Sequence, residues 1–289
     1  MTTTITPTAK HTVDLTVDLT APFHHGAGSA GNTSLLRTQD VVQPDGTVAR
    51  VPFLSAASIR HALRDALAWH TARTLNITPG SLSKATVDLL WTGGAVSSTG
   101  SRINLDLMRR VEDHYPAMRL LGYAAQSDII EGTLRASDLI LVCAENDWRL
   151  PDNLRGARRA AAYRTEEFGT RHDQAANPAG RYITIAESDT MDTAQMIWDT
   201  QVLAAGSTLH GTITLTPAAT DMHHTVLDAA LALWAPDGQV ALGAKTAQGY
   251  GTGRIRDWDT SRATAVEAWT THLVDHAEDI LALLDEMGH

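Results

Sequence analysis

The chain begins with an alternation of apolar and polar residues that has the period of a strand with one buried face. In residues 11–20 the apolar positions are Val13, Leu15, Val17 and Leu19. The same alternation predicts a strand at 209–215 and a short one at 181–186. Residues 251–258 are expected to form a final strand. A nearly continuous apolar run within 134–144 is typical of a strand at the centre of a sheet.

Apolar residues at helical spacing separate these strands. Ser55 and Ser58 are residue types that suit the start of a helix. The apolar residues that follow recur every fourth position, as Ile59, Leu63 and Leu67. We therefore expect a helix to about residue 75, an amphipathic helix at 221–234 and a last one at 264–287.

The connecting segments carry turn and break signals. Residues 81–126 have a helical pattern, with a break at Gly93-Gly94 and a kink or stop at Pro116. The turn Pro44-Asp45-Gly46 between valine-rich segments predicts a hairpin, and residues 24–32 predict a glycine-bearing loop.

With the long connections left aside, the order is strand, helix, strand, strand, helix, strand. We therefore expect an α+β fold, a ferredoxin-like/RRM-type βαββαβ core in a single domain over residues 1–289. A helical insertion at 79–127 and a long thumb-like insertion at 147–206 interrupt this core, and an acidic C-terminal helix follows at 262–289. Connections much longer than about 4–6 residues are usually functional, so we expect function in the insertions.

The distribution of charge changes what the composition implies. The net charge is −10, whereas phosphate binding draws its affinity from lysine and arginine. Eight acidic residues and one arginine fall within 257–289, so the C-terminal tail carries most of the negative charge. Six arginines stand against four acidic residues within 151–181. That segment is compatible with RNA, and a solvated surface is the alternative.

The remaining composition bounds the location and the redox chemistry. The sequence has no run of about 18 apolar residues, and residues 1–10 lack the apolar stretch of a signal peptide. We therefore expect a cytoplasmic protein without a membrane segment. The single cysteine, Cys143, excludes a disulfide framework, and its apolar surroundings predict a buried, inert thiol.

Two segments carry groups that suit phosphate binding. Residues 243–253, here called the glycine loop, hold four glycines and Lys245, and glycine lets backbone N–H groups approach an anion. The loop lacks the Walker and dinucleotide spacings, so we expect no nucleotide cofactor. The helix start at 51–64 places two serines and two arginines near N–H groups that bind phosphate. An ordinary glycine turn and an ordinary capped helix are the alternatives.

Taken as a pair, these segments resemble the superfamily of repeat-associated CRISPR proteins, in which a serine-rich helix start and a terminal Gly-Tyr-Gly loop recur on ferredoxin-like folds. The matching residues are Pro52, Ser55, Ser58, Ile59, Arg60, Arg64, Gly243, Lys245, Gly249, Tyr250 and Gly251. The acidic charge, and alanines where the family has glycines, make the chain most similar to type IV backbone subunits.

The resemblance implies a subunit present in several copies along a guide RNA. The helix start and the glycine loop would hold phosphates, and the thumb of one copy would press over the RNA onto the next. The RNA-binding residues it implies are Ser55, Ser58, Arg60, Arg64, Arg158, Arg159, Arg164, Gly243, Lys245, Gln248, Gly249, Tyr250 and Gly251. The expected partners are guide RNA, copies of the chain, other CRISPR effector subunits, and target nucleic acid paired to the guide.

Three further hypotheses involve catalysis. Type III relatives cut target RNA with an aspartate in a Gly-x-Asp setting after the first strand, but residues 31–34 hold no carboxylate and Asp40 lies too far along. A guide-processing endoribonuclease would use His24 or His25 as acid and base. A metal-dependent hydrolase is the third hypothesis, although adjacent histidines point apart on a strand or helix. We therefore expect no catalytic residue, no metal site and no cofactor. The histidine groups considered for a metal are His24-His25, His172-Asp173, His223-His224 and the pair His272 and His276.

Overall fold

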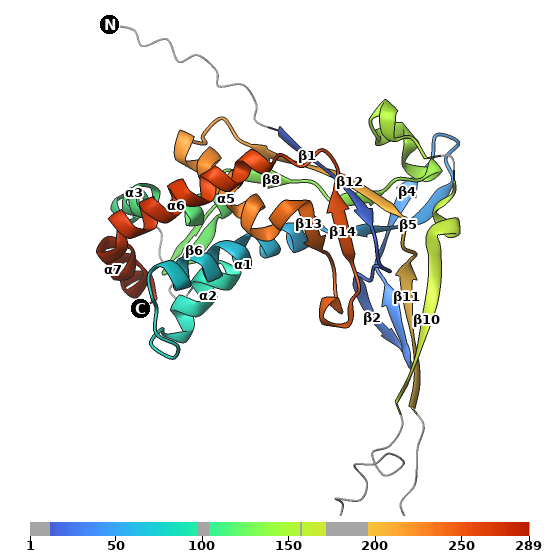
Figure 1. Cartoon of the computed structure of the whole chain (residues 1–289), viewed down its shortest axis with the longest axis horizontal. Helices are drawn as coiled ribbons and strands as arrows, with labels where there is room; N and C mark the ends of the chain where they lie inside the picture. Colours follow the sequence, from blue (N-terminus) through green and yellow to red (C-terminus); the bar gives the residue numbers. More distant parts are fainter. Residues whose placement is uncertain (1–11, 97–103, 157, 172–195, 289) are drawn as a thin grey trace, which may run out of the picture.

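The computed structural model describes residues 12–96, 104–156, 158–171 and 196–288, and it has the predicted α+β composition (Figure 1). Its largest sheet has the strand order β13-β14-β1-β12-β9-β5-β4, and β8 also pairs with β12. These strands pair in antiparallel fashion. Their bounds are β1 (Thr12–Leu19), β4 (Thr38–Val42), β5 (Val48–Leu54), β8 (Leu134–Ala136), β9 (Leu139–Leu141), β12 (Thr208–Leu215), β13 (Gln239–Ala241) and β14 (Thr252–Ile255).

β1 lies between β12 and β14 in this sheet. Its four alternating apolar residues are buried, as the pattern predicts. Of their polar neighbours, Thr16 is buried as well, with its hydroxyl 3.0 Å from Nδ1 of His210. The strands predicted at 209–215 and 251–258 are confirmed as β12 and β14, and the turn at 44–46 joins β4 and β5 in a hairpin.

Two helices form the layer that packs against the sheet, α1 (Ala56–Thr74) and α5 (Asp221–Trp234), both where the sequence predicts them. They contact each other, and their buried residues share one hydrophobic core with β1 and β12. Figure 1 shows the helices gathered on one side of the sheet. The apolar stripe of α1 is buried, so burial of that face holds the helix in place.

The segment after α1 is helical, as predicted, and breaks where the sequence indicates. It contains α2 (Lys84–Thr92), α3 (Leu105–His114) and α4 (Pro116–Leu121). Gly93 ends α2 with a φ of 93°, and Pro116 begins α4 directly after α3. The helical pattern was expected to continue to 126, and this part is wrong. β6 (Tyr123–Ala125) and β7 (Asp128–Ile130) form a hairpin instead, because strands this short are defined by their partner and not by periodicity.

The predicted strand at 134–144 is split into β8 and β9. Asp138 lies between them, and its carboxylate accepts a hydrogen bond of 2.8 Å from the backbone N–H of Ala56, at the start of α1. The interruption therefore joins the sheet to the first turn of the helix.

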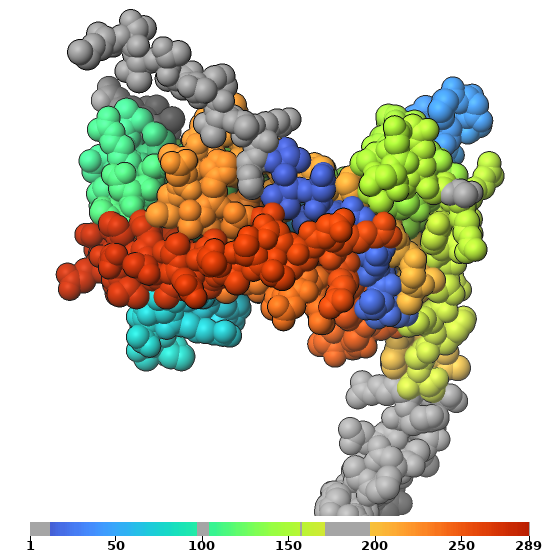
Figure 2. All heavy atoms as spheres, turned by 45° about the horizontal axis from the view of Figure 1, so that its top comes forward, coloured from blue at the N-terminus to red at the C-terminus, as the bar shows by residue number. Residues whose placement is uncertain are grey.

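A second sheet has the order β10-β11-β3-β2. Its strands are β2 (Gly26–Ala30), β3 (Thr33–Leu36), β10 (Arg164–Arg171) and β11 (Met196–Leu203). The expected loop at 24–32 is therefore wrong, since most of it is β2, whose small residues carry no apolar alternation. Figure 2 shows residues 144–156 and 158–171 at the end of the molecule opposite the C-terminal helices. The strand predicted at 181–186 lies outside the described residues.

The acidic C-terminal segment forms two helices where the sequence predicted one. α6 (Ala263–Asp275) and α7 (Ala277–Met287) meet at His276, whose φ of −109° and ψ of 17° leave helical geometry. The bend brings α7 against α2 and α3, and Arg110 on α3 binds Glu286 on α7 with two hydrogen bonds of 2.7 Å. Within the part of the chain that the structure describes, no helix is both long and apolar enough to cross a membrane.

Candidate nucleic-acid interface

A cleft of about 380 Å³ brings together the two segments that the sequence singled out. Ser58 and His61 on α1 line one side, and Leu242 and Gly243 at the start of the glycine loop line the other, with Trp234 of α5 beside them. These residues are about 185 positions apart in the sequence, and Figure 1 shows α1 beside β13. The tertiary structure therefore places the helix start and the glycine loop in one surface feature.

The start of α1 is capped by groups of the protein itself. Ser55 is the N-cap, and its hydroxyl accepts a hydrogen bond from the backbone N–H of Ser58 and lies 3.0 Å from the Ser58 hydroxyl. The Asp138 carboxylate accepts a hydrogen bond from the backbone N–H of Ala56. A phosphate at this terminus would compete with a carboxylate. Ser58 is nevertheless part of the cleft, so its hydroxyl is the group of this turn that is best placed to meet a ligand.

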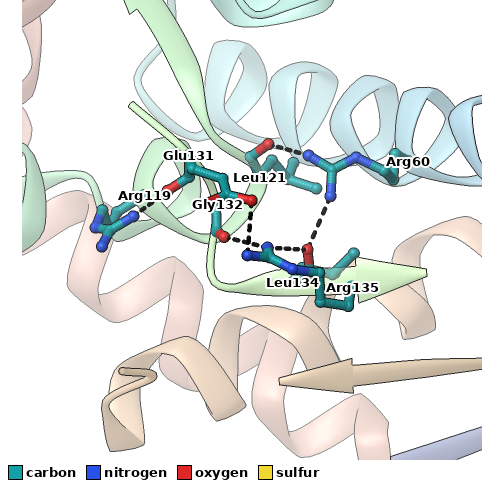
Figure 3. Close-up of polar contacts among 7 residues, drawn as sticks. All are labelled: Arg60, Arg119, Leu121, Glu131, Gly132, Leu134 and Arg135. Atoms are coloured by element: carbon teal, nitrogen blue, oxygen red, sulfur yellow. Dashed lines mark hydrogen bonds and ion pairs between the residues drawn. The ribbon is translucent and has the colours of Figure 1, made fainter. Parts of the chain in front are cut away.

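Arg60 and Arg64 point into the protein. Figure 3 shows the Arg60 guanidinium donating to the carbonyl oxygens of Leu121, at 2.5 Å, and Leu134, at 2.9 Å. Arg64 donates to the carbonyl oxygen of Gly122, at 2.6 Å. Burial lowers the pKa of both guanidinium groups, that of Arg64 to about 10. Both arginines therefore hold the 121–134 segment on α1, a structural role that the sequence did not predict.

The backbone of the glycine loop is packed closely against its surroundings. A Cβ on Gly251, which has a φ of 73°, would stand 1.9 Å from the carbonyl oxygen of Leu242, and one on Gly243 would stand 2.3 Å from that of His24. Gly249 also has a positive φ, of 87°, but open space around it. The N–H groups of Gly249 and Gly251 bind carbonyls within the protein, at 3.0 and 2.7 Å. The glycines therefore allow a tight fold of the loop and do not leave these N–H groups open to an anion.

The side chains of Lys245 and Tyr250 connect this loop to the second sheet by hydrogen bonds. The Lys245 ammonium donates to the hydroxyls of Ser34 on β3, at 3.2 Å, and Thr200 on β11, at 2.5 Å. Burial and a hydrogen bond to the Glu167 carboxylate on β10 raise the pKa of Tyr250 to about 12. Hydroxyls are neutral, so these two contacts position the lysine without cancelling its charge. Gln248, between these two residues, is exposed.

The three candidate arginines at 158, 159 and 164 lie before or at the start of β10. Arg158 and Arg159 are exposed just before β10, and Arg164 is the exposed first residue of that strand. Glu167, which contacts Tyr250, is three positions further along β10. Successive strand residues face opposite sides, so Arg164 faces away from the loop. The structure therefore places Arg164 on a different surface from the glycine loop.

Two residues at these surfaces were missed in the sequence. Asp199 on β11 pairs with Thr33 and accepts a hydrogen bond of 2.6 Å from its hydroxyl, so a carboxylate does stand beside residues 31–34. A separation of 166 residues hid this contact from any local motif. His61 lines the cleft beside Ser58, and its position one turn along the same helix was the available signal. Asp40 lies on β4 with Arg50 at 3.6 Å.

The residues of the catalytic hypotheses are mostly buried. His24 is 3% exposed, with its Nδ1 2.8 Å from the carbonyl oxygen of Gln201. Burial lowers the pKa of His25 to about 4. His223 is buried as part of the capping box of α5, and the pair at 172–173 lies outside the described residues. Cys143 is buried as predicted, and burial raises its pKa to about 12.

Comparison with known proteins gives a likeness of fold. No protein-family model and no curated protein matches the sequence. Among solved structures, a chain of a "Type IV-B CRISPR Complex" is similar, with a TM-score of 0.56 and 18% sequence identity. The similarity covers 86% of this chain and 91% of the other, so it extends over both proteins and not over one motif. The chain therefore has the fold of a subunit of a type IV-B CRISPR complex.

Proposed function

We propose that this protein is a non-catalytic backbone subunit of a CRISPR effector ribonucleoprotein, which binds guide RNA through its phosphates and lines up in copies along it. The fold likeness over nearly the whole of both chains supports this proposal. The order β14-β1-β12-β9 with α1 and α5 on one side also supports it, and we propose that these elements form the ferredoxin-like core of the RNA-recognition type.

The observation that carries the proposal is the meeting of α1 and the glycine loop in one cleft. Single-stranded RNA that is held by its backbone needs positive charge and hydrogen-bond donors along a groove. Here Ser58 lines the cleft, and Lys245 and the exposed Gln248 follow in the loop that borders it. Guide sequences vary, so contacts of this kind, which read no bases, suit the task.

The second surface gives a role to the thumb-like insertion. Arg158, Arg159 and Arg164 are exposed, and Arg164 on β10 faces away from the glycine loop. One surface of a copy would thus hold its own stretch of guide, and the other would reach the RNA of the next copy. Other effector subunits, and target nucleic acid paired to the guide, complete the proposed partners.

Catalysis has no part in this proposal. A general base works best with a pKa near the pH of the reaction, and the buried His25, with a pKa of about 4, is far below it. Asp199 stands near residues 31–34, but a hydrogen bond from Thr33 already engages its carboxylate. We propose that neither residue cuts RNA and that RNA binding itself needs no cofactor.

The test is to co-express the chain with a CRISPR-array transcript and purify it. Absorbance at 260 and 280 nm reports bound RNA, and size exclusion with light scattering reports the copies per particle. We expect RNA of defined length in a multi-copy particle. Arg158→Glu with Arg159→Glu should reduce the number of copies while each chain stays folded. An RNA-free monomer from the wild-type chain, even with partner subunits present, would refute the proposal.

A further inference from the structure

Three side chains with metal-binding atoms converge where the C-terminal helices meet the helical insertion. His114 is the last residue of α3, His276 joins α6 to α7, and Asp279 is in the first turn of α7. The Nδ1 atoms of the two histidines are 3.2 Å apart, and Asp279 Oδ2 is 3.6 Å from His114 Nδ1. All three ligand atoms lie within 4.8 Å of one another.

These distances fit the edges of a tetrahedral metal site. Zinc binds histidine nitrogen and carboxylate oxygen at about 2.0–2.2 Å, which places neighbouring ligand atoms about 3.3 Å apart. The two separations from His114 Nδ1, 3.2 and 3.6 Å, lie on either side of that value. Two ring nitrogens that face each other can share at most one proton in a hydrogen bond, whereas a cation between them satisfies both lone pairs.

The surroundings hold these rings in place. The Nε2 atom of His272 is 3.0 Å from the carbonyl oxygen of His114, which ties α6 to the end of α3. The His272 ring stacks on the buried Trp269, with centroids 5.3 Å apart and planes at 16°, and lies 4.4 Å from the ring of His276. Outer contacts of this kind fix the orientation of metal ligands.

We propose that His114, His276 and Asp279 bind one zinc ion, which ties α3 of the helical insertion to the junction of α6 and α7. Two imidazole nitrogens suit zinc better than magnesium or calcium, which prefer oxygen ligands, and a carboxylate oxygen also binds zinc. The Asp279 side chain is 60% exposed, so water can enter and complete the tetrahedron. The ion would join helices whose ligands, His114 and His276, are more than 160 residues apart in the sequence.

The test uses the full chain after treatment with a chelator. We expect isothermal titration calorimetry to give one zinc ion per chain and thermal denaturation to show a higher melting temperature with zinc. Cobalt should give the intense visible absorption of a tetrahedral site. His114→Ala and His276→Ala should abolish these signals, and Asp279→Asn should weaken binding by about tenfold or more. The matched control, His61→Ala, removes an exposed histidine of α1 and should bind zinc like the wild type.

Two results would overturn the proposal. One is the absence of saturable binding at one ion per chain, and the other is equal binding by the wild type and by Asp279→Asn. The second comparison remains decisive if a histidine variant does not fold, because Asp279 is a mainly exposed side chain whose loss spares the core. RNA binding is measured in a separate experiment, so the zinc proposal is tested independently of the proposed function.

Discussion

Lys245 offers the sharpest test of the proposed interface. Lys245→Gln removes the positive charge but keeps a polar side chain that can still hydrogen-bond to the hydroxyls of Ser34 and Thr200. The loop should therefore keep its position, and the change should act on RNA binding through charge alone. Lys84 provides the matched control, because its side chain is 88% exposed on α2 and pairs there with Asp88.

The magnitude follows from the release of counterions. Each phosphate neutralised on a single strand contributes about 0.7 to the slope of log affinity against log salt concentration. Loss of one contact should lower that slope by about 0.7 per chain. If the two proteins bind RNA equally at 1 M salt, a slope difference of about 0.7 makes the affinity of the variant about fivefold lower at 0.1 M salt. This factor corresponds to about 1 kcal/mol of binding free energy.

The assay is fluorescence anisotropy with a labelled single-stranded RNA over a series of salt concentrations. We expect Lys245→Gln to bind more weakly at low salt, to approach the wild type as salt rises, and to unfold at the wild-type urea concentration. Lys84→Gln should match the wild type throughout. If the two lysine variants give the same slope, the glycine loop makes no phosphate contact through Lys245 and the reasoning is wrong.

Three further predictions concern the residues around the interface. Gly251→Ala should destabilise the protein by about 3 kcal/mol in urea titrations, and Gly249→Ala by only about 1 kcal/mol, because open space surrounds the second glycine; equal losses would contradict the close approach. Arg64→Ala should cost about 2–3 kcal/mol and leave the salt slope of RNA binding unchanged, and a changed slope would place this arginine in the interface. The hydrogen-bonded ion pair with Arg256 lowers the pKa of Asp18. The wild type should therefore be more stable than Asp18→Asn above about pH 4. This difference should disappear at lower pH, because acid protonates the carboxylate. Both side chains are more than a third exposed, so the difference should stay below about 1 kcal/mol, and an advantage that persists at low pH would contradict it.

The sequence by itself determined the elements whose pattern is strong and local. The alternation in β1 and the four-residue spacing in α1 each report burial on one face, and both elements lie where they were predicted. The breaks at Gly93 and Pro116 follow from backbone chemistry that needs no partner. The local patterns failed at β2, at β6 and β7, and at the bend between α6 and α7. Short strands and helix bends depend on what lies opposite them, which no local window contains.

The candidate site likewise has features that the sequence shows and features that only the tertiary structure shows. Residue types and spacing were enough to single out the helix start and the glycine loop, and the tertiary structure brings them into one cleft. The sequence could not show that Arg60 and Arg64 bind backbone carbonyls, or that Asp199 lies beside Thr33. Whether a polar group meets a ligand or the protein depends on contacts across the fold. For this chain, sequence therefore determined which groups are available for binding, and only tertiary structure decided which of them the protein already uses.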